Sequence, residues 1–536
     1  MASTARKITL PLALILLLPS ATFAWLYRSM PQLSSYHDDS VYWLSAQSLA
    51  HGDGYRIAHL PEQPAQTKYP PLYPALLALV WKFVPSFPGN LSAVTAVQWS
   101  FLPLCLLFAW FYFRRCRFSP LPAYGLTFLI AAAPMTIVFA VSSMTELPFT
   151  TMLLALMLLI ETEDDVPVKR ALLAGVLAGA AFLIRTNAIV LAASVPLIWV
   201  LAGRRYRSAV AFSAPLLATI AGWQAWCAIH AFPAKDNILS YYTSYVGFYI
   251  RTFSWADLPV RVWVNADAVI ESLARGVLFN TGDEMWLRPI AWVITVTAIS
   301  GAVILYRRGF RQYPAFAALF VVVLLLWQYP PDQRFVYPLM PLYIAGLATK
   351  LAEIGGMAVT TWRTVRGGNR YAAVVLLTMI ILVAAGSVAS MALGDGVLLP
   401  RYFRDRQTQR SQMTNVYRWI ASSTRADELF AAYDDTLLYL YSGRRGYTVP
   451  ILPELVYSAA PDAVSKYVPT LAGLWREKRV TYVLVTQYDF QRDLHKPALD
   501  SLDLLLQDRA RFQPVYADSI ARVFRLVPET GIAQSH

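Results

Sequence analysis

Two adjacent carboxylates, Asp38 and Asp39, lie in the segment SSYHDDSVYWLSAQSLAHGDGY, just after one of the most apolar stretches of the chain. A positioned carboxylate can act as a general base that takes a proton from an attacking hydroxyl or amine, while its neighbour orients it or binds a cation. The pattern also favours a helix start, because Ser35 and Asp38 fit a capping box and acidic residues suit a first turn. Both interpretations stay open, since a capped helix also holds a carboxylate rigidly.

Three basic residues and one acidic residue stand beside other apolar runs: Lys68 in TKYPPLYPALLALV, Glu146 in SSMTELPF, Arg185 in FLIRTN and Arg334 in PPDQRFVYPLMPLY. An Arg side chain is energetically costly within a membrane, so Arg185 indicates a transport pathway, a charged partner or an interface. The alternative is that Arg185 lies in a short turn at the outer surface, with its guanidinium among the lipid headgroups. Glu146 fits a helix-boundary residue as well as a carboxylate that faces the Asp pair across a cavity. Because Arg and Lys neutralise phosphate oxygens, the set suits an anionic lipid phosphate beside a general base.

Metal ligands have no recognisable spacing in the first loop. Three of the six histidines fall there, at His37, His51 and His59, without the HxH or HExxH pattern typical of zinc sites. This spacing favours scattered surface histidines. A divalent cation held by Asp38 or Asp39 with Glu146 stays open as an alternative. The three cysteines form no CxxC motif and predict no disulfide framework.

The composition is that of a membrane protein. Of the 536 residues, 57% are hydrophobic and 15% are charged, whereas soluble chains carry about 25% charged residues. The formal net charge is +13, but the basic residues gather between long apolar runs, where bilayer orientation explains them. We therefore predict membrane lipids, and no nucleic acid, among the partners.

Long apolar runs predict a polytopic α-helical protein with about eleven transmembrane helices. A hydrocarbon core of about 30 Å needs roughly 20 apolar residues of helix. The runs that qualify, or nearly so, are 8–27, 91–113, 121–141, 146–160, 171–184, 188–201, 209–229, 290–306, 315–327, 336–351 and 371–393. A further helix at 71–84 is too short to be assigned as a span. We predict that it lies along the interface, with Trp81 near the headgroups.

Clusters of Lys and Arg set the predicted orientation. They occur at 6–7, 114–117, 169–170, 204–207, 307–311 and 350–370, all on one side if eleven helices cross the membrane. Because such clusters mark the cytoplasmic side, the N-terminus is predicted to be cytoplasmic in an inner or plasma membrane. The outer loops 28–90 and 230–289 and the tail from 394 then lie outside. The first span also fits a signal peptide cleaved near SATFA, and the first loop stays outside either way.

Two domains are predicted, a transmembrane domain at 1–393 and a small extracytoplasmic α/β domain at 394–536. In the second, helical segments (NVYRWIASS, DTLLYLYSG, DAVSKYVPTLAGLWREK) alternate with strand-like ones (ELFAAY, GYTVPI, VTYVLVTQ, QPVYA, ARVFRLV). It has no Gly-rich phosphate loop and no Ser/His/Asp spacing. We interpret it as an accessory domain, for acceptor binding.

The first loop resembles the GT-C superfamily of polyprenyl-phosphate-sugar-dependent glycosyltransferases, nearest to the protein O-mannosyltransferase and lipid A aminoarabinose transferase branch. In that family an Asp-Glu pair precedes a Tyr, a Gly-containing turn and a Lys-Pro-Pro-Leu-like segment. Asp38, Tyr42 and Gly52 match, Asp39 replaces the usual Glu, and Lys68, Pro70, Pro71 and Leu72 match with Tyr69 inserted. DQRFVYPLMPLY is similar to the family's Arg-x-x-x-Pro-x-x-Pro segment. The resemblance covers about 1–393.

The resemblance implies an integral membrane hexosyl- or pentosyltransferase. Its donor would be a polyprenyl-phosphate-linked sugar, its acceptor a lipid, glycan or protein, and transfer would invert the sugar on the extracytoplasmic face. The predicted site comprises the catalytic pair Asp38 (general base) and Asp39, the phosphate-binding Lys68, Arg334 and Arg185, the supporting or metal-binding Glu146, and the substrate-positioning Tyr42 and Tyr69.

A polytopic transporter or lipid-linked sugar flippase is the alternative function. Such proteins carry polar residues deep within their spans, whereas the unusual charges here stand at helix ends and in loops. A structural or sensor protein would explain the C-terminal segment but not the first loop.

Overall fold

The computed structural model describes residues 2–161, 166–203, 205–278, 287–364, 368–457, 462–491 and 495–528. It is mostly helical, at 71%, as the apolar runs predict. Some positions named above lie outside the described residues: 204 and 365–367 in the basic clusters, 279–286 in the second outer loop, and 458–461, 492–494 and 529–536 in the C-terminal segment.

Within the described residues, five helices are long and apolar enough to cross a membrane, or six if one bent pair counts as a single span. Shorter apolar helices accompany them, so the count of eleven stays a prediction. The apolar helices are α1 (Ala2–Leu26), α4 (Leu91–Arg115), α5 (Pro120–Ala131), α6 (Pro134–Ala140), α7 (Glu146–Ile160), α8 (Val168–Ile184), η1 (Thr186–Val190), α9 (Leu191–Gly203), α10 (Tyr206–Ile229), α14 (Leu287–Arg307), α15 (Gln312–Leu325), α17 (Met340–Thr364) and α18 (Gly368–Leu393).

The run predicted as one continuous helix at 121–141 is instead two helices. α5 and α6 meet at an angle of 65°. Ala133 between them is extended, with φ −68° and ψ 122°, because the residue before a proline disfavours the helical conformation and Pro134 follows it.

Glycines let several apolar helices approach closely. A side chain at Gly301 of α14 would collide with the Gly346 carbonyl of α17, and one at Gly175 of α8 would collide with the Phe212 carbonyl of α10. Membrane helices pack through such small residues, because lipid tails leave little hydrophobic gain from helix association.

Residues 28–90, named the first outer segment after their predicted location, carry α2 (Asp38–His51), which ends at Gly52 with a φ of 88°, and α3 (Leu72–Phe83). The rings of Trp43 and Trp81 stack at 4.6 Å, and Trp81 Nε1 donates to the Trp43 carbonyl at 3.1 Å. The predicted helix at 71–84 is therefore present. Its Trp81 is buried because α2 covers it, and the location of this helix at the membrane interface stays a prediction.

Further helices come from two other parts of the chain. Residues 230–289, named the second outer segment after their predicted location, include α11 (Asn237–Thr243), α12 (Tyr245–Thr252) and α13 (Leu258–Arg275). The short α16 (Gln333–Val336) and η2 (Tyr337–Leu339) lead into α17. Asp332 begins α16 by accepting the backbone N–H of Arg334 at 3.1 Å, which fixes the start of that helix.

The C-terminal segment forms a five-stranded mixed sheet in the order β2-β1-β3-β5-β4. Its strands are β1 (Phe430–Ala432), β2 (Gly446–Tyr447), β3 (Tyr482–Thr486), β4 (Phe512–Ala517) and β5 (Ala521–Leu526), with β1 parallel to both β2 and β3. Its helical elements are η3 (Gly394–Leu398), α19 (Leu399–Ser423), α20 (Asp435–Ser442), α21 (Pro453–Tyr457), α22 (Ala463–Tyr467), η4 (Val468–Thr470), α23 (Leu471–Glu477) and α24 (His495–Leu506). The predicted helices and strands are present, although Pro469 divides the predicted helix at 462–478. The helices α21 and α24 were not predicted.

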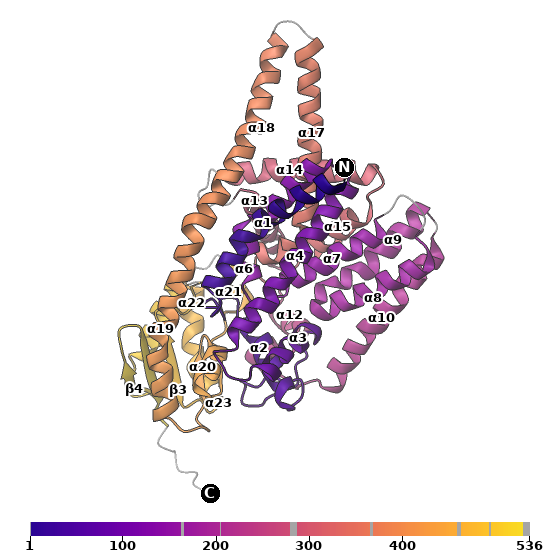
Figure 1. Ribbon diagram of the computed structural model, residues 1–536. Coiled ribbons are helices and arrows are strands. Elements are labelled where there is room, and N and C mark those ends of the chain that lie inside the picture. Colours follow the sequence, from indigo (N-terminus) through magenta and orange to yellow (C-terminus); the bar gives the residue numbers. More distant parts are fainter. Residues whose placement is uncertain are drawn as a thin grey trace.

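The first outer segment and the sheet lie at the same end of the molecule. Figure 1 shows α2, α3 and the strands toward one end, whereas the N-terminus and the projecting pair α17 and α18 lie toward the other. Arg410 of α19 fastens the two regions together by donating to the carbonyls of Pro31 and Leu33 at 3.2 and 2.7 Å. The turn that precedes Asp38 is thus held to the C-terminal segment.

Candidate active site

Asp38 is the first residue of α2, and its carboxylate lies between two groups from distant parts of the chain. Oδ2 accepts from the Arg334 guanidinium at 3.2 Å, and Oδ1 accepts from the Tyr69 hydroxyl. Burial alone would raise the pKa of Asp38, but Arg334, Lys68 and the Tyr69 hydrogen bond together hold that pKa below its ordinary value. Asp38 is therefore an ionised carboxylate at neutral pH.

Asp39 is buried, and its carboxylate accepts hydrogen bonds from two backbone N–H groups near the start of α2. Its Oδ2 accepts the Ser34 N–H and its Oδ1 the Ser40 N–H, each at 2.9 Å. Burial raises the pKa of Asp39 to about 7, against these two hydrogen bonds. The side chain thus closes the turn that precedes α2.

The predicted capping box at Ser35 and Asp38 is wrong. The residue before the helix is His37, which has a φ of 62° and makes no side-chain cap. The chain turns sharply at Ser34 and His37, both of positive φ, and this turn brings the Ser34 N–H to the Asp39 carboxylate, which accepts its hydrogen bond.

Lys68 lies in a ring of tyrosines from both outer segments. Its Nζ is 3.5 Å from the ring centre of Tyr241, 5.1 Å from that of Tyr245 and 5.2 Å from that of Tyr69. Burial lowers the pKa of Lys68 to about 7, although Asp38 acts in the opposite direction. The ammonium is held by aromatic faces and is free of a short ion pair with any described residue, so it can meet a phosphate.

Arg334 pairs with two carboxylates. Besides Asp38, its Nε lies 3.3 Å from Asp332 Oδ1, and the guanidinium stacks over the ring of Phe335 at 4.7 Å. Arg334 therefore presents a fixed positive charge next to Asp38.

Arg185 and Glu146 form a buried ion pair. Arg185 lies in the break between α8 and η1, and donates to Glu146 Oε1 at 2.7 Å and to Thr145 Oγ1 at 2.9 Å. Glu146 is the first residue of α7 and has no exposed surface. Glu146 thus holds Arg185 in place and is separate from the Asp pair.

Tyr42 and Tyr69 pack edge to face, with ring centres 4.8 Å apart. Tyr42 makes a second such contact with Tyr73 at 5.6 Å. Because Tyr69 also donates to Asp38, the two predicted positioning residues lie directly behind the carboxylate.

Two cavities meet at Asp38 and Arg334. The smaller, of about 70 Å³, is lined by Lys68, Arg185 and Arg334 with Tyr42 and Tyr69. One water needs about 10–15 Å³ by the same measure, so this space suits a group the size of a phosphate. The larger, of about 570 Å³, lies between the first outer segment and the sheet, and has the size of a small-molecule site. Asp39 and Glu146 line neither.

A divalent cation does not fit the carboxylates suggested for it. Asp38 and Glu146 each pair with a guanidinium, and Asp39 bonds to backbone N–H groups. The three histidines of the first loop lie apart from these carboxylates: His37 Nε2 is 2.8 Å from the Tyr242 hydroxyl, His51 meets the edge of Trp81, and the buried His59 lies 3.5 Å from Asp435 without a hydrogen bond. In the part of the chain that the structure describes, no three His, Cys, Asp or Glu residues gather to hold a metal.

Several residues of the site were not predicted. Tyr241 and Tyr245 come from SYYTSY in the second outer segment, and Asp434 and Asp489 follow β1 and β3. The carboxyl ends of parallel strands are where open α/β sheets bind ligands. The position of YDDT after a predicted strand was therefore a usable signal for Asp434.

Comparison with known proteins shows similarity in structure alone. No family model matches the sequence, and no curated protein matches it. A crystal structure of ArnT from Cupriavidus metallidurans bound to undecaprenyl phosphate is similar with a TM-score of 0.53 and 13% identity, over 95% of this chain and 98% of that one.

Two structures of an archaeal oligosaccharyltransferase are also similar. The apo form from Archaeoglobus fulgidus has a TM-score of 0.55 and 12% identity, over 99% of this chain and 76% of that one. The AglB complex with an inhibitory peptide and a dolichol-phosphate has a TM-score of 0.53 and 12% identity, over 99% and 75%. These neighbours are GT-C superfamily glycosyltransferases, and the fold that they share with this chain is the one that the first loop predicts.

Proposed function

We propose that this chain, which has the GT-C fold, is an integral membrane glycosyltransferase that moves a sugar from a polyprenyl-phosphate donor to an acceptor hydroxyl. One observation carries the proposal: the Asp38 carboxylate stands between a small cationic cavity and a large cavity. A base placed there can contact an acceptor on one side while the leaving phosphate is held on the other.

The donor phosphate is assigned to the smaller cavity. Lys68, Arg185 and Arg334 line it against the single carboxylate of Asp38. Arg185 and Arg334 are paired with carboxylates, whereas Lys68 has no short ion pair with a described residue, so its charge is available to stabilise the negative charge that grows on a departing phosphate. The structural neighbours include proteins with bound undecaprenyl phosphate and dolichol-phosphate, which supports a polyprenyl donor for this chain.

Asp38 is assigned as the general base. It takes the proton of the acceptor hydroxyl as that oxygen bonds to the anomeric carbon, while the bond from this carbon to the phosphate oxygen breaks. Polyprenyl phosphate leaves with both electrons of that bond. Attack opposite the leaving group inverts the anomeric configuration. Asp39 is assigned a positioning role, because it closes the turn before α2 and reaches neither cavity.

The site is assigned to the extracytoplasmic face, with the N-terminus cytoplasmic, and the C-terminal segment from 394 is proposed to be the outer α/β domain. The first outer segment and the sheet lie at one end of the molecule and the N-terminus at the other (Figure 1), which supports this orientation. The charges of the site belong to helix starts and breaks and to connecting segments. A transporter would need them deep within its spans.

The test is donor consumption by the purified protein in nanodiscs. A panel of polyprenyl-phosphate hexoses and pentoses is supplied, and release of free polyprenyl phosphate is followed by mass spectrometry. We expect one donor to be consumed, slowly by water and faster with an acceptor. Movement of intact donor across proteoliposomes without cleavage would support a flippase and overturn the proposal.

A further inference from the structure

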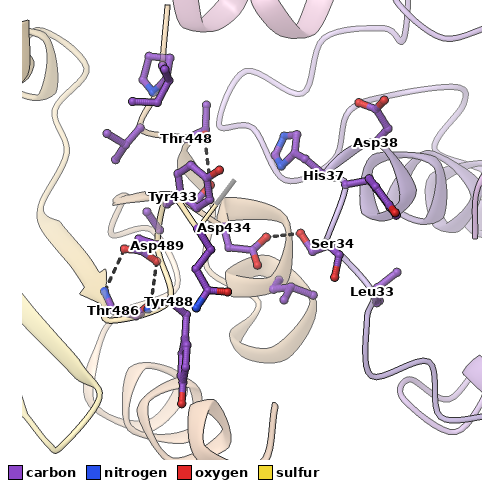
Figure 2. Close-up of a pocket in the computed structure, with 18 of the residues that line it drawn as sticks. Leu33, Ser34, His37, Asp38, Tyr433, Asp434, Thr448, Thr486, Tyr488 and Asp489 are labelled. Atoms are coloured by element: carbon purple, nitrogen blue, oxygen red, sulfur yellow. Dashed lines mark hydrogen bonds between the residues drawn. The ribbon is translucent and has the colours of Figure 1, made fainter. Parts of the chain in front are cut away.

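Two carboxylates that the proposed chemistry at Asp38 does not use, Asp434 and Asp489, line the larger cavity. Tyr433 and Asp434 follow β1, and Tyr488 and Asp489 follow β3, so all four lie at the carboxyl edge of two parallel strands. Figure 2 shows them on one side of the cavity, with Ser34, His37 and Asp38 of the first outer segment on the other. This is the edge at which open α/β sheets bind ligands.

The two carboxylates are fixed but keep capacity to accept further hydrogen bonds. Asp434 Oδ1 accepts from Ser34 Oγ, and no described donor is hydrogen-bonded to its Oδ2. Asp489 accepts the N–H and the hydroxyl of Thr486 at 2.9 and 2.7 Å. Each carboxylate oxygen offers two lone pairs, so both residues can accept from ligand hydroxyls.

The charges around the larger cavity nearly balance. The lining carries four carboxylates, Asp38, Asp332, Asp434 and Asp489, and three guanidinium groups, Arg334, Arg406 and Arg410. Arg410 is occupied by backbone carbonyls and the Tyr441 hydroxyl. The cavity therefore lacks the excess of positive charge that would favour an anionic ligand such as a lipid phosphate or an acidic peptide.

Aromatic rings complete the lining. They include Tyr241, Trp327, Tyr329, Tyr417, Tyr433 and Tyr488. Tyr417 is held by stacking on Tyr441 at 5.3 Å, and Tyr433 packs against Phe490 at 4.4 Å. Rigid rings offer large apolar faces at little entropic cost, and such faces fit the C–H surface of a sugar ring.

We propose that the larger cavity binds a neutral saccharide as acceptor, with Asp434 and Asp489 accepting hydrogen bonds from its hydroxyls and the tyrosines packing on its rings. The proposal rests on the transferase function proposed above, because Asp38 lies at the inner boundary of the same cavity and would take the proton of the attacking hydroxyl.

Direct binding tests the proposal without turnover. The full chain in nanodiscs is titrated with neutral trisaccharides of glucose, mannose, galactose and arabinose, and saturation-transfer NMR measures binding. We expect at least one to bind, and Asp434→Asn and Asp489→Asn each to weaken it tenfold or more. The matched control Asp500→Asn, at an exposed position on α24, should bind as the unsubstituted protein does.

A second readout separates this proposal from the proposed function. Undecaprenyl phosphate binding should be the same in Asp434→Asn, Asp489→Asn and the unsubstituted protein, and Tyr488→Ala serves if either Asn variant fails to fold. Absence of saccharide binding, binding that none of these variants weakens, or transfer only to a peptide or a phospholipid would overturn the saccharide proposal. If the unsubstituted protein does not bind undecaprenyl phosphate, the proposed transferase function would be overturned instead.

Discussion

The carboxylates of Asp38 and Asp39 are adjacent in the chain and share no hydrogen-bond partner among the residues that the structure describes. Asp38 bonds to Arg334 and Tyr69 at the junction of two cavities, whereas Asp39 bonds to the N–H groups of Ser34 and Ser40. Successive residues of a helix point roughly 100° apart, because 3.6 residues complete a turn. Asp38 therefore faces the two cavities, and Asp39 holds the turn that precedes the helix.

Replacing Asp38 by Asn removes the proposed base and keeps the shape of the side chain. A general base contributes about 10²–10⁴-fold to rate, so we expect sugar transfer to fall by that factor. Polyprenyl phosphate should still bind. The measurement is transfer of radiolabelled sugar by the variant beside an equally folded preparation of the unsubstituted protein. Full activity would remove Asp38 from the mechanism.

The alkaline side of the pH profile reports Lys68. Burial lowers its pKa to about 7, so the side-chain amine of Lys68 is protonated and charged below that pH and neutral above it. We expect kcat/KM for the donor to fall as pH rises through about 7, since this ratio reports groups of the free enzyme. Lys68→Arg keeps its charge and should lose that fall, whereas Lys466→Arg, at an exposed position, should retain it. Identical alkaline profiles for all three would argue against Lys68 as the phosphate ligand.

Asp39 is expected to affect stability more than catalysis. Its pKa is about 7 in the native state against an ordinary value of 3.8, so its contribution to stability decreases as pH rises from about 4 to about 7 and is constant above. Asp39→Asn cannot titrate. The unfolding temperature of the unsubstituted protein should thus fall relative to that of Asp39→Asn across this range, with transfer retained within about tenfold. A difference that does not change with pH would contradict this account.

The Arg185–Glu146 pair can be tested by a double-mutant cycle. Removing one partner leaves the other charge buried, which costs about 3–5 kcal/mol. We expect Glu146→Gln and Arg185→Gln each to lower the unfolding temperature, and the double variant to regain part of the loss. Arg185→Gln should also weaken donor binding, because Arg185 lines the smaller cavity, and the double variant should not recover that binding. Additive losses of stability would show that the two side chains do not interact in the folded protein.

The sequence predicts the local elements of the fold, but not how distant elements pack against one another. The apolar runs gave most of the helices, and the strand-like segments gave all five strands. Pro134 broke a predicted span because backbone sterics overrode hydropathy. The burial of Trp81 was not predicted, because it depends on α2, a second helix whose packing no hydropathy pattern reveals.

The sequence by itself determined the membrane class, the resemblance in the first loop, and the charged residues that stand where apolar runs end. Only the tertiary structure decided that Asp38, and not Asp39, lies at the junction of the cavities, that Glu146 serves Arg185, and that Asp434 and Asp489 face the same space. The reason is physical: a sequence pattern fixes the face of a helix or strand on which a side chain lies. Its partners are determined only when the elements pack, and they can be far along the chain: Ser34 and Asp434 are 400 residues apart.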